Sequence, residues 1–275
     1  MPPDDLVGGA TRLFGIVGDP VAQVRTPAVL TARLRALGHD AILLPFHAPA
    51  DRFETVVEGL MALRNLDGLV FTIPFKGRAM AFADEVGPEA EAGGGINALA
   101  RRADGRWSGE MFDGLGCLAA LREAGYDPAG RRVLLIGAGG AGTSIGLAVA
   151  RTGPARMRIA DTDPARAVSL AGRIRTLAPD LPVEIGAADP AGADMILNAS
   201  PMGMADRPDS PLSGPIERKA VVFDAVAKPA ETRLMADARA AGAHVVGGEA
   251  MIRGQSGLIL EFLLNQHNER YGDST

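Results

Sequence analysis

The stretch RVLLIGAGGAG, residues 132–142, constrains the fold more than any other part of the chain. An apolar run typical of a buried strand leads into Gly137, Gly139 and Gly142, which have the spacing G-x-G-x-x-G. The first glycine permits a tight turn, the second lets a pyrophosphate approach the backbone, and the third lets the helix pack on the strand. The N–H groups at the start of that helix attract phosphate. The stretch therefore predicts dinucleotide binding. The expected contacts are Gly137, Ala138, Gly139, Gly140 and Ala141.

An acidic residue indicates which dinucleotide is bound. The next expected strand, residues 157–161, ends in Asp161, about 20 residues beyond the glycine loop, where a carboxylate binds the adenosine ribose. A carboxylate accepts a hydrogen bond from a 2′-hydroxyl group and repels a 2′-phosphate, so NAD is favoured over NADP. Arg158 and Arg166 are close enough in sequence for an arginine to meet a phosphate, and Arg166 is an expected cofactor contact. Methyltransferases carry similar glycine loops, and a nucleotide-free α/β domain also remains open.

Strands and helices alternate along the chain, which predicts an α/β fold with parallel strands. The expected strands are 12–18, 40–46, 69–73, 132–137, 157–161, 194–200, 221–226 and 244–248. One helix should begin at Thr26 and Pro27, with Thr26 as N-cap and Pro27 as the first helical residue. A final helix should run from about Gly248 to Asn268. At 275 residues the chain is long enough for two domains.

Composition excludes several classes of partner. The net charge of -5 argues against nucleic-acid or acidic-membrane partners, which favour basic surfaces. No apolar run reaches the roughly 18 residues of a membrane span. The N-terminal MPPDDLVGG lacks a signal-peptide pattern, and the single cysteine suits a reducing compartment, so a cytoplasmic protein is expected. The four histidines are not spaced for a metal site, and no metal is expected.

The segment VFTIPFK, residues 70–76, ends in an unusual basic residue. Of the 28 basic residues only Lys76, Lys219 and Lys228 are lysines. Arginine cannot release its proton in a protein, whereas a lysine can when its surroundings lower its pKa. Lys76 is therefore a candidate for proton transfer. On these residues alone, a solvated lysine after a strand would explain the position equally well.

Seven segments resemble motifs of shikimate dehydrogenases, in the same order. They are GIVGDPVAQVRTP (15–27), FTIPFK (71–76), GGGINAL (93–99), GEMFDGLGC (109–117), GAGGAG (137–142), NASPMGM (198–204) and GGEAMIRGQ (247–255). The resemblance covers nearly the whole chain. It implies a two-domain α/β protein with an active-site cleft between the domains. Residues 1–113 with 250–275 would form an N-terminal substrate domain, and residues 114–249 a Rossmann-type NAD-binding domain.

The resemblance also implies roles for individual residues. Lys76 and Asp113 would form the catalytic acid–base pair for NAD-dependent oxidation of a ring alcohol in a shikimate-like hydroxy acid. The implied substrate-binding residues are Thr26, Thr72, Asn97 and Gln255. The further implied cofactor contacts are Ser200, Met202, Val226, Gly248 and Met251. The protein would act as a monomer or homodimer.

The chain departs from the family pattern where the substrate would lie. Val24 replaces one of two serines that hold the substrate carboxylate, Val70 replaces an asparagine, and Ala227 replaces a tyrosine. Each lost hydrogen bond to a buried group costs about 1–3 kcal/mol. The chain is therefore expected to be a divergent paralogue with a more apolar substrate. Arg25 and Arg253 are candidates for a new cation that binds a substrate carboxylate, but a solvated arginine explains either position more simply. A true shikimate or quinate dehydrogenase and a non-catalytic NAD-binding regulator remain the alternatives.

Overall fold

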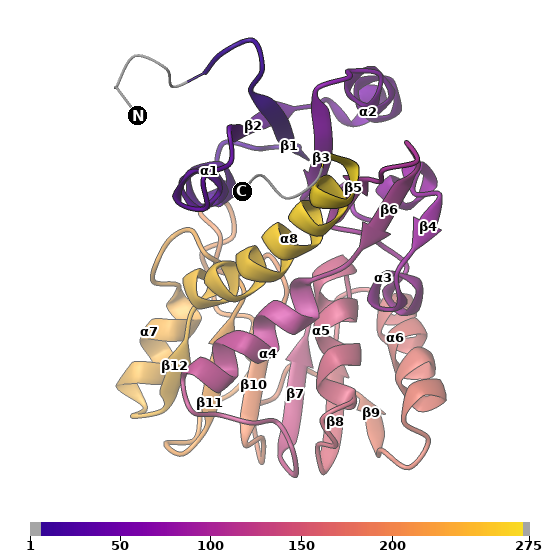
Figure 1. The fold of residues 1–275 in the computed structure, drawn as a ribbon. Coiled ribbons are helices and arrows are strands. Elements are labelled where there is room, and N and C mark those ends of the chain that lie inside the picture. Colours follow the sequence, from indigo (N-terminus) through magenta and orange to yellow (C-terminus); the bar gives the residue numbers. More distant parts are fainter. Residues whose placement is uncertain (1–6, 272–275) are drawn as a thin grey trace. The chain divides into compact units, whose positions relative to one another are not determined.

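The computed structural model describes residues 7–271, with side chains up to His267, and contains two compact units (Figure 1). The first unit extends to Phe112 and takes in the residues from Ser256 onward, and the second is Asp113–Gln255. Asp113 and residues 250–255, which we assigned to the substrate domain, therefore group with the second unit. Most of the N-terminal segment MPPDDLVGG, for which no signal peptide is expected, lies outside the described residues.

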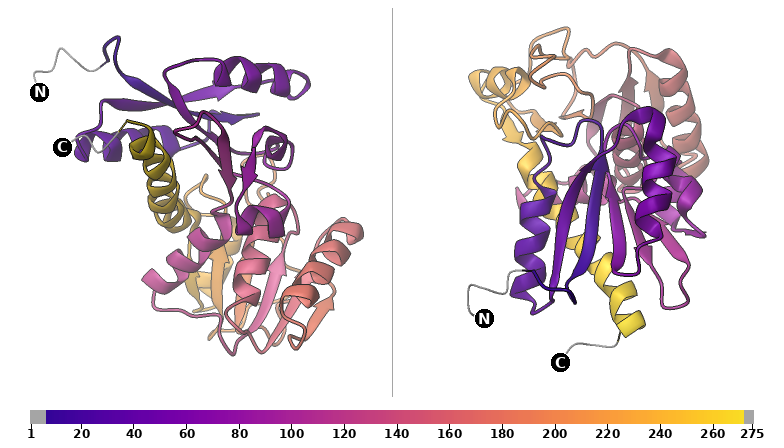
Figure 2. Two further views of the ribbon diagram at one scale, coloured as in Figure 1. Left: turned by 45° about the vertical axis from the view of Figure 1, so that its right-hand side comes forward. Right: turned by 90° about the horizontal axis from the view of Figure 1, so that it is seen from above.

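The first unit is built on a six-stranded sheet of order β2-β1-β3-β5-β6-β4. Its strands are β1 (Arg12–Gly18), β2 (Ala41–His47), β3 (Leu66–Phe71), β4 (Glu85–Val86), β5 (Ala98–Arg101) and β6 (Trp107–Glu110). Strand β1 pairs in parallel with β2 and β3, whereas β5 runs antiparallel to both β3 and β6. The helices are α1 (Thr26–Ala36), α2 (Phe53–Met61) and α3 (Pro88–Gly93). The right-hand view of Figure 2 shows β1–β3 lying between α1 and α2.

The predicted N-cap of α1 is wrong by one residue. The helix begins at Thr26, and its N-cap is Arg25, which makes no side-chain capping bond. Thr26 is itself the first helical residue, so it is not the non-helical residue that an N-cap requires. Pro27 remains in the first turn, where its missing N–H group costs nothing.

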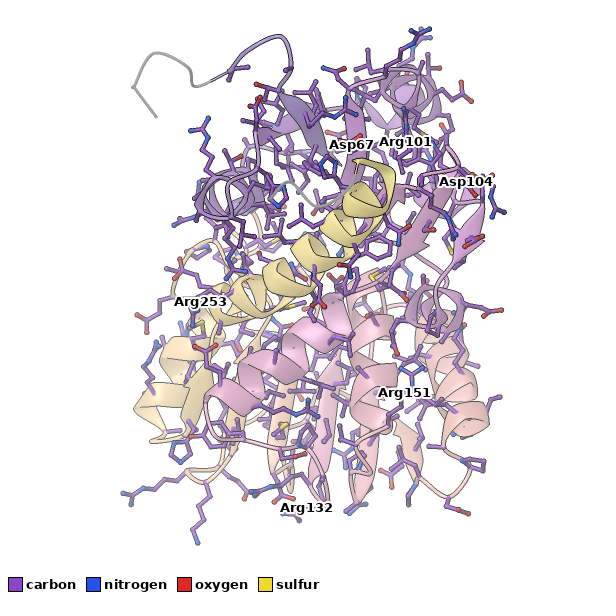
Figure 3. All side chains as sticks on the ribbon, in the orientation of Figure 1. Asp67, Arg101, Asp104, Arg132, Arg151 and Arg253 are labelled. Atoms are coloured by element: carbon purple, nitrogen blue, oxygen red, sulfur yellow. The ribbon has the colours of Figure 1, made fainter. Side chains whose placement is uncertain are left out.

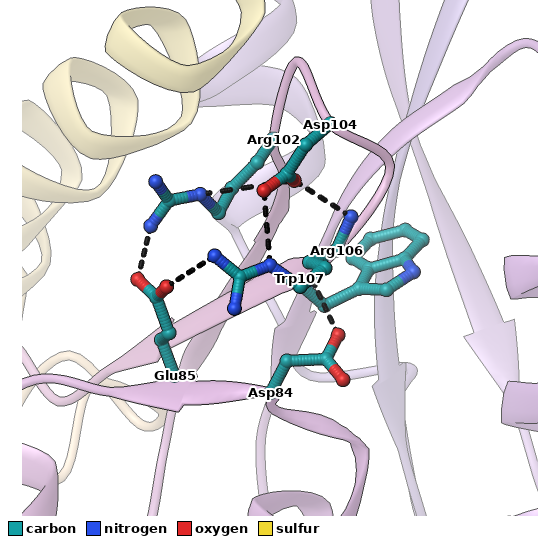
Figure 4. A network of polar contacts seen from close by, with 6 residues as sticks. All are labelled: Asp84, Glu85, Arg102, Asp104, Arg106 and Trp107. Carbon is teal, nitrogen blue, oxygen red and sulfur yellow. Dashed lines mark hydrogen bonds and ion pairs between the residues drawn. The ribbon is translucent and has the colours of Figure 1, made fainter.

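The hairpin of β5 and β6 carries a network of charges (Figure 4). Arg102 and Arg106 both pair with Glu85, and Arg106 also bonds Asp104 at 2.9 Å. The Trp107 N–H group donates to Asp84 at 2.8 Å. These contacts fix the short edge strand β4 beside β6.

The second unit contains a fully parallel sheet of order β12-β11-β10-β7-β8-β9, seen side by side in Figure 1. Its strands are β7 (Arg132–Ile136), β8 (Arg156–Ala160), β9 (Val183–Ile185), β10 (Met195–Asn198), β11 (Val221–Asp224) and β12 (His244–Val246). The strand order reverses between β7 and β10, which makes that gap the topological switch point.

Five helices belong wholly or partly to the second unit. They are α4 (Asp113–Glu123), α5 (Gly140–Ala150), α6 (Pro164–Leu177), α7 (Arg233–Ala240) and α8 (Gly248–Tyr271). Helix α8 begins in the second unit and ends in the first. In the first unit its His267 bonds Asp67 of β3, and its Phe262 ring lies 5.5 Å from that of Phe112. Within the described part of the chain, no helix is long and apolar enough to cross a membrane.

Candidate active site

Lys76 lies in a turn that the aromatic core of the first unit holds in place. Strand β3 ends at Phe71, two residues earlier than predicted, and the chain turns so that the Phe75 N–H group donates to the Thr72 carbonyl at 2.9 Å. Phe75 is fully buried, and its ring stacks on Phe53 with 4.1 Å between ring centroids. This anchor fixes the backbone of the half-buried Lys76, which follows directly.

Backbone hydrogen bonds join the Lys76 turn to the segment that contains Asn97. The Lys76 carbonyl accepts from the Ile96 N–H group at 2.9 Å. Asn97 is 2% exposed, and its side-chain oxygen accepts from the Phe112 N–H group at 3.0 Å. The structure thus brings Lys76 and Asn97 onto neighbouring segments. It also uses the Asn97 amide oxygen to hold the residue before Asp113.

Thr72 is tied to the loop that follows β1. Its N–H group donates to the Val17 carbonyl at 3.0 Å, and the Asp19 N–H group donates to the Ile73 carbonyl at 3.0 Å. A Cβ atom at Gly18 would lie 2.4 Å from the Thr72 methyl group, so only glycine permits this approach. The loop leads to Thr26, the half-buried first residue of α1.

Two glycines of the DGLG motif explain the close packing around Asp113 in the second unit. Asp113 is 1% exposed and begins α4. The Gly114 N–H group donates to the Ser144 hydroxyl of α5 at 2.8 Å, and a Cβ atom at Gly114 would lie 2.3 Å from the Ser144 carbonyl oxygen. A Cβ atom at Gly116 would lie 2.6 Å from the Cβ of Gln255. These positions therefore require glycine.

Gln255 carries an unsatisfied polar atom. Its side-chain oxygen Oε1 is buried and has no hydrogen-bond partner among the described residues. A buried acceptor of this kind is costly unless it receives a hydrogen bond, and a hydroxyl group of a ligand would supply one. The role of Gln255 in substrate binding stays a prediction.

The glycine loop has the geometry that a pyrophosphate needs. Gly137 has a φ of +95°, and a Cβ atom there would lie 2.8 Å from the Ser200 backbone nitrogen. A Cβ atom at Gly142 would lie 2.0 Å from the Gly137 carbonyl oxygen, so the helix can pack this closely only with glycine. At Gly139 a Cβ atom would meet nothing within 4 Å. The open space at Gly139, before the start of α5, fits a phosphate group.

Asp161 supports the glycine loop directly. One carboxylate oxygen accepts from the Ala138 N–H group at 2.6 Å, and the other accepts from the Asp163 N–H group at 2.8 Å. Each oxygen keeps a lone pair with which it can accept from a ribose hydroxyl group. Arg166 instead forms an exposed pair with Asp163 at 3.4 Å.

Two polar residues that the sequence analysis did not select lie at the carboxyl ends of neighbouring strands. Asn198 ends β10 and Asp224 ends β11, and the two are paired in register. Both side chains are fully buried. The signal in the sequence was a polar residue directly after an apolar strand, at the sheet edge where parallel α/β folds bind ligands. They lie beside Ser200, Met202 and Val226, to which they are hydrogen-bonded.

Other candidate residues have simpler environments. Val70 is 4% exposed, and Val24 and Ala227 are half-buried. Gly248 is the first residue of α8, and a Cβ atom at this position would lie 2.6 Å from the Val226 carbonyl oxygen. Met251 is 6% exposed.

The single cysteine does not contribute to the site. Cys117 is fully buried, and burial, reinforced by Asp113, raises the pKa of its thiol far above the usual range, so it is an unreactive packing residue. Among residues 7–267 no three His, Cys, Asp or Glu side chains are grouped so that they could hold a metal ion.

Comparison with known proteins identifies the family. Residues 16–99 match the family model described as the shikimate dehydrogenase substrate binding domain. The chain is 38% identical over 253 residues to the shikimate dehydrogenase (NADP(+)) of Rubrobacter xylanophilus, which is 90% of this chain and 88% of that protein.

Solved structures agree with this match. Shikimate 5-dehydrogenase from Listeria monocytogenes, in complex with shikimate and NAD, is 27% identical with a TM-score of 0.84, over 94% of this chain and 93% of that one. The 5-ketofructose reductase of a Gluconobacter strain is 29% identical with a TM-score of 0.82, over 94% of both chains. The glycine loop, the VFTIPFK turn and the DGLG helix are thus parts of a known fold, and the chain belongs to the shikimate dehydrogenase family.

Proposed function

We propose that this chain is an NAD-dependent oxidoreductase of the shikimate dehydrogenase type that acts on a secondary ring alcohol. The observation that carries the proposal is that one chain contains both a fixed lysine turn and an open glycine loop. The first unit holds Lys76 on a turn anchored by buried aromatic rings. The second unit holds the open glycine loop with Asp161 bonded to it.

In this proposal Lys76 and Asp113 are the acid–base pair. A bound nicotinamide would supply the hydride acceptor for oxidation of the alcohol. In that direction the Lys76 amine takes the hydroxyl proton. In the reverse direction the Lys76 ammonium group returns that proton to the carbonyl oxygen. The proposal assigns to the Asp113 carboxylate the stabilisation of the ammonium form. Gln255, through its unpartnered oxygen, accepts from a substrate hydroxyl group.

Asp161 supports a preference for NAD. Its carboxylate is fixed by two backbone N–H groups, so it cannot easily turn away from a cofactor that carries a 2′-phosphate. Arg166, the nearby cation, is paired with Asp163. Among the similar proteins, the Rubrobacter relative is named for NADP, whereas the Listeria structure contains NAD, so the family accommodates both.

The substrate is proposed to be more apolar than shikimate at the positions of Val24, Val70 and Ala227. Val70 is almost fully buried and offers no hydrogen bond to a ring hydroxyl group. The Gluconobacter relative, named as a reductase of 5-ketofructose, supports a family whose members differ in substrate. Shikimate and quinate themselves remain the second candidates because Thr26, Thr72, Asn97 and Gln255 are present.

The test measures initial rates with shikimate and quinate, each with NAD and with NADP. It compares the native protein with Lys76→Ala, Lys76→Arg and a matched control, Lys219→Ala, which changes an exposed lysine. Both Lys76 variants should lose at least about 100-fold in kcat while they still bind NADH, because arginine keeps the charge but cannot release a proton. The control should match the native protein.

Three other results would change the proposal in different ways. Activity retained in Lys76→Arg would contradict the proton-transfer role. Two inert substrates with NADH still bound would move the substrate to another ring alcohol. A native protein that binds neither NADH nor NADPH would overturn the oxidoreductase assignment itself.

A further inference from the structure

The proposed chemistry makes no use of one fully buried carboxylate, that of Asp224. One oxygen accepts from the Val226 N–H group at 3.0 Å and from the Asn198 amide at 3.0 Å. The other accepts from the Thr232 hydroxyl group at 2.6 Å. None of these three donors is cationic. Burial raises the pKa of Asp224 above its ordinary value, and the hydrogen bonds from Thr232, Val226 and Asn198 offset this only in part.

Asp224 determines the orientation of the Asn198 amide. The Asn198 nitrogen donates to Asp224 and to the Met202 carbonyl at 3.0 Å. Its oxygen accepts from the Ser200 N–H group at 3.1 Å and from the Ser200 hydroxyl at 2.6 Å. If the amide rotated by half a turn, its oxygen would face the carboxylate and both sets of bonds would be lost. The carboxylate therefore holds the loop that contains Ser200 and Met202.

A second branch of the same network runs through Thr232. Thr232 is the N-cap of α7, and its hydroxyl accepts from the Met235 N–H group at 3.2 Å. Gly203, with a φ of +102°, packs on it so closely that a Cβ atom would lie 3.0 Å from the Thr232 methyl group. One carboxylate thus connects the loop after β10, the turn after β11 and the start of α7.

The sheet topology places this network on one half of a dinucleotide site. The glycine loop and Asp161 follow β7 and β8, on the side of the switch point that holds the adenosine and pyrophosphate. Asn198 and Asp224 end β10 and β11, on the other side, where the second half of a dinucleotide lies. The two sides meet at Gly137, against which the Ser200 backbone packs.

We infer that Asp224 is the positioning residue for the nicotinamide half of the cofactor site. It acts through Val226 directly and through Asn198 on Ser200 and Met202. The inference rests on the proposed function, since it requires that the chain bind a nicotinamide dinucleotide. It differs from a general structural role because the hydrogen bonds of Asp161, on which the adenosine half is built, go to Ala138 and Asp163 and do not involve Asp224.

The experiment compares affinities for NAD and for ADP-ribose, which lacks the nicotinamide ring, by titration calorimetry. Asp224→Ala should lower the affinity for NAD by about tenfold and leave the affinity for ADP-ribose unchanged. Asp224→Asn should restore most of the NAD affinity, because an amide can accept from Val226 and Asn198 and donate to Thr232. Asn198→Ala removes the amide that links Asp224 to Ser200 and Met202, and the same loss of NAD affinity is expected. This variant provides the test if Asp224→Ala does not fold.

The matched control is Asp194→Ala, at the opposite end of β10, where Asp194 pairs with Arg132 at the lower edge of Figure 3. It should change neither affinity. If the native protein prefers NADP, NADP and 2′-phospho-ADP-ribose replace the two ligands.

Equal weakening of both ligands, unchanged NAD affinity, or the same loss in Asp224→Asn as in Asp224→Ala would each overturn the inference. If the native protein binds ADP-ribose as tightly as NAD, the inference fails but the proposed function does not. Failure of the native protein to bind any of these nucleotides would overturn the proposed function as well.

Discussion

Asp67 in the first unit and Asp224 in the second are buried to the same degree but are held in opposite ways. Asp67 is 1% exposed and accepts from two cationic or basic side chains, the Arg12 guanidinium at 2.5 and 2.8 Å and His267 at 3.0 Å. Burial alone would raise its pKa, but the bonds from Arg12 and His267 outweigh burial, and the pKa lies below the ordinary value. Among the described residues Asp224 has only neutral donors, and burial raises its pKa.

The difference separates two uses of a buried carboxylate. A buried carboxylate paired with a guanidinium is costly to disrupt, because removing one partner leaves the other charge buried. A carboxylate surrounded by neutral donors is costly to keep ionised, but it can orient several dipoles at once. Groups with pKa values raised by burial tend to occur at functional sites, which agrees with the place of Asp224 at the cofactor edge of the sheet.

The largest expected effect is that of Asp67→Asn. The amide would place N–H groups opposite Arg12 or His267, and it would remove the negative charge that pairs with the guanidinium. We therefore expect a loss of about 3 kcal/mol in the free energy of unfolding. Urea denaturation at pH 7 measures it, with Asp51→Asn, an exposed carboxyl, as the control. A loss below about 1 kcal/mol would show that the pair is worth little more than a surface contact.

Thr232→Val should have the next largest effect. It removes the hydroxyl that donates to Asp224 and caps α7, at a cost of about 2 kcal/mol. Thr232→Ser keeps both bonds and loses only a methyl group, at a cost of about 0.8 kcal/mol. Thermal or urea unfolding of the two variants separates the hydrogen bonds from the packing. A loss in Thr232→Ser as large as that in Thr232→Val would show that the methyl contact with Gly203 matters as much as the two hydrogen bonds.

The pH dependence of two Asp→Asn variants should have opposite signs. Asp224, with a raised pKa, contributes stability that is present below the unfolded pKa of 3.8 and is lost as the pH rises through its folded pKa. Asp67, with a lowered pKa, contributes stability that is present above 3.8 and is lost as the pH falls through its folded pKa.

Unfolding free energies between pH 3 and 8 test this, each compared with the corresponding Asp→Asn variant. The advantage of the native protein over Asp67→Asn should grow with pH, whereas its advantage over Asp224→Asn should shrink. At pH 7 we expect Asp224→Asn to lie within about 1 kcal/mol of the native protein. Curves with the same slope would remove the distinction between the two sites.

The smallest effect is expected for Asp194→Asn, which repeats the geometry of the Asp67 pair at the surface. Arg132 donates to Asp194 at 3.0 and 2.7 Å, but the side chains are 46% and 31% exposed. Hydrogen bonds from Arg132 lower the pKa of Asp194 to about 2. Because solvent screens this pair, its loss should cost only about 0.5 kcal/mol. The difference should vanish as the pH falls from 3.8 to about 2, measured by urea unfolding.

The parts of the site that could be predicted from the sequence are those with local spacing. The glycine loop and Asp161 were recognisable because strand, turn, helix and acid follow one another in a fixed order. The α/β class followed from the alternation of elements, and the structure and the relatives confirm it. The roles proposed for Lys76, Asp113 and Gln255 came from the family resemblance, and they stay predictions.

The rest depends on pairings between distant segments. The Asn198–Asp224 contact requires the register of β10 on β11, which no local pattern specifies. His267 and Asp67 are 200 positions apart, and neither residue type by itself indicates a partner. The error at the start of α1 has a local cause. Proline fits either of the first two helical positions, because neither N–H group has a partner within the helix, so Pro27 does not show which residue is the N-cap.

The path of α8 bears on the order in which the chain can fold during synthesis. The second unit is one continuous segment, Asp113–Gln255, whereas the first unit needs residues from Ser256 onward, which the ribosome makes after it. Domains usually fold in the order of their synthesis. Here the N-terminal unit cannot be completed first, because Asp67 lacks its partner His267 until the end of α8 has been synthesised. The parallel sheet of the second unit is complete before that point.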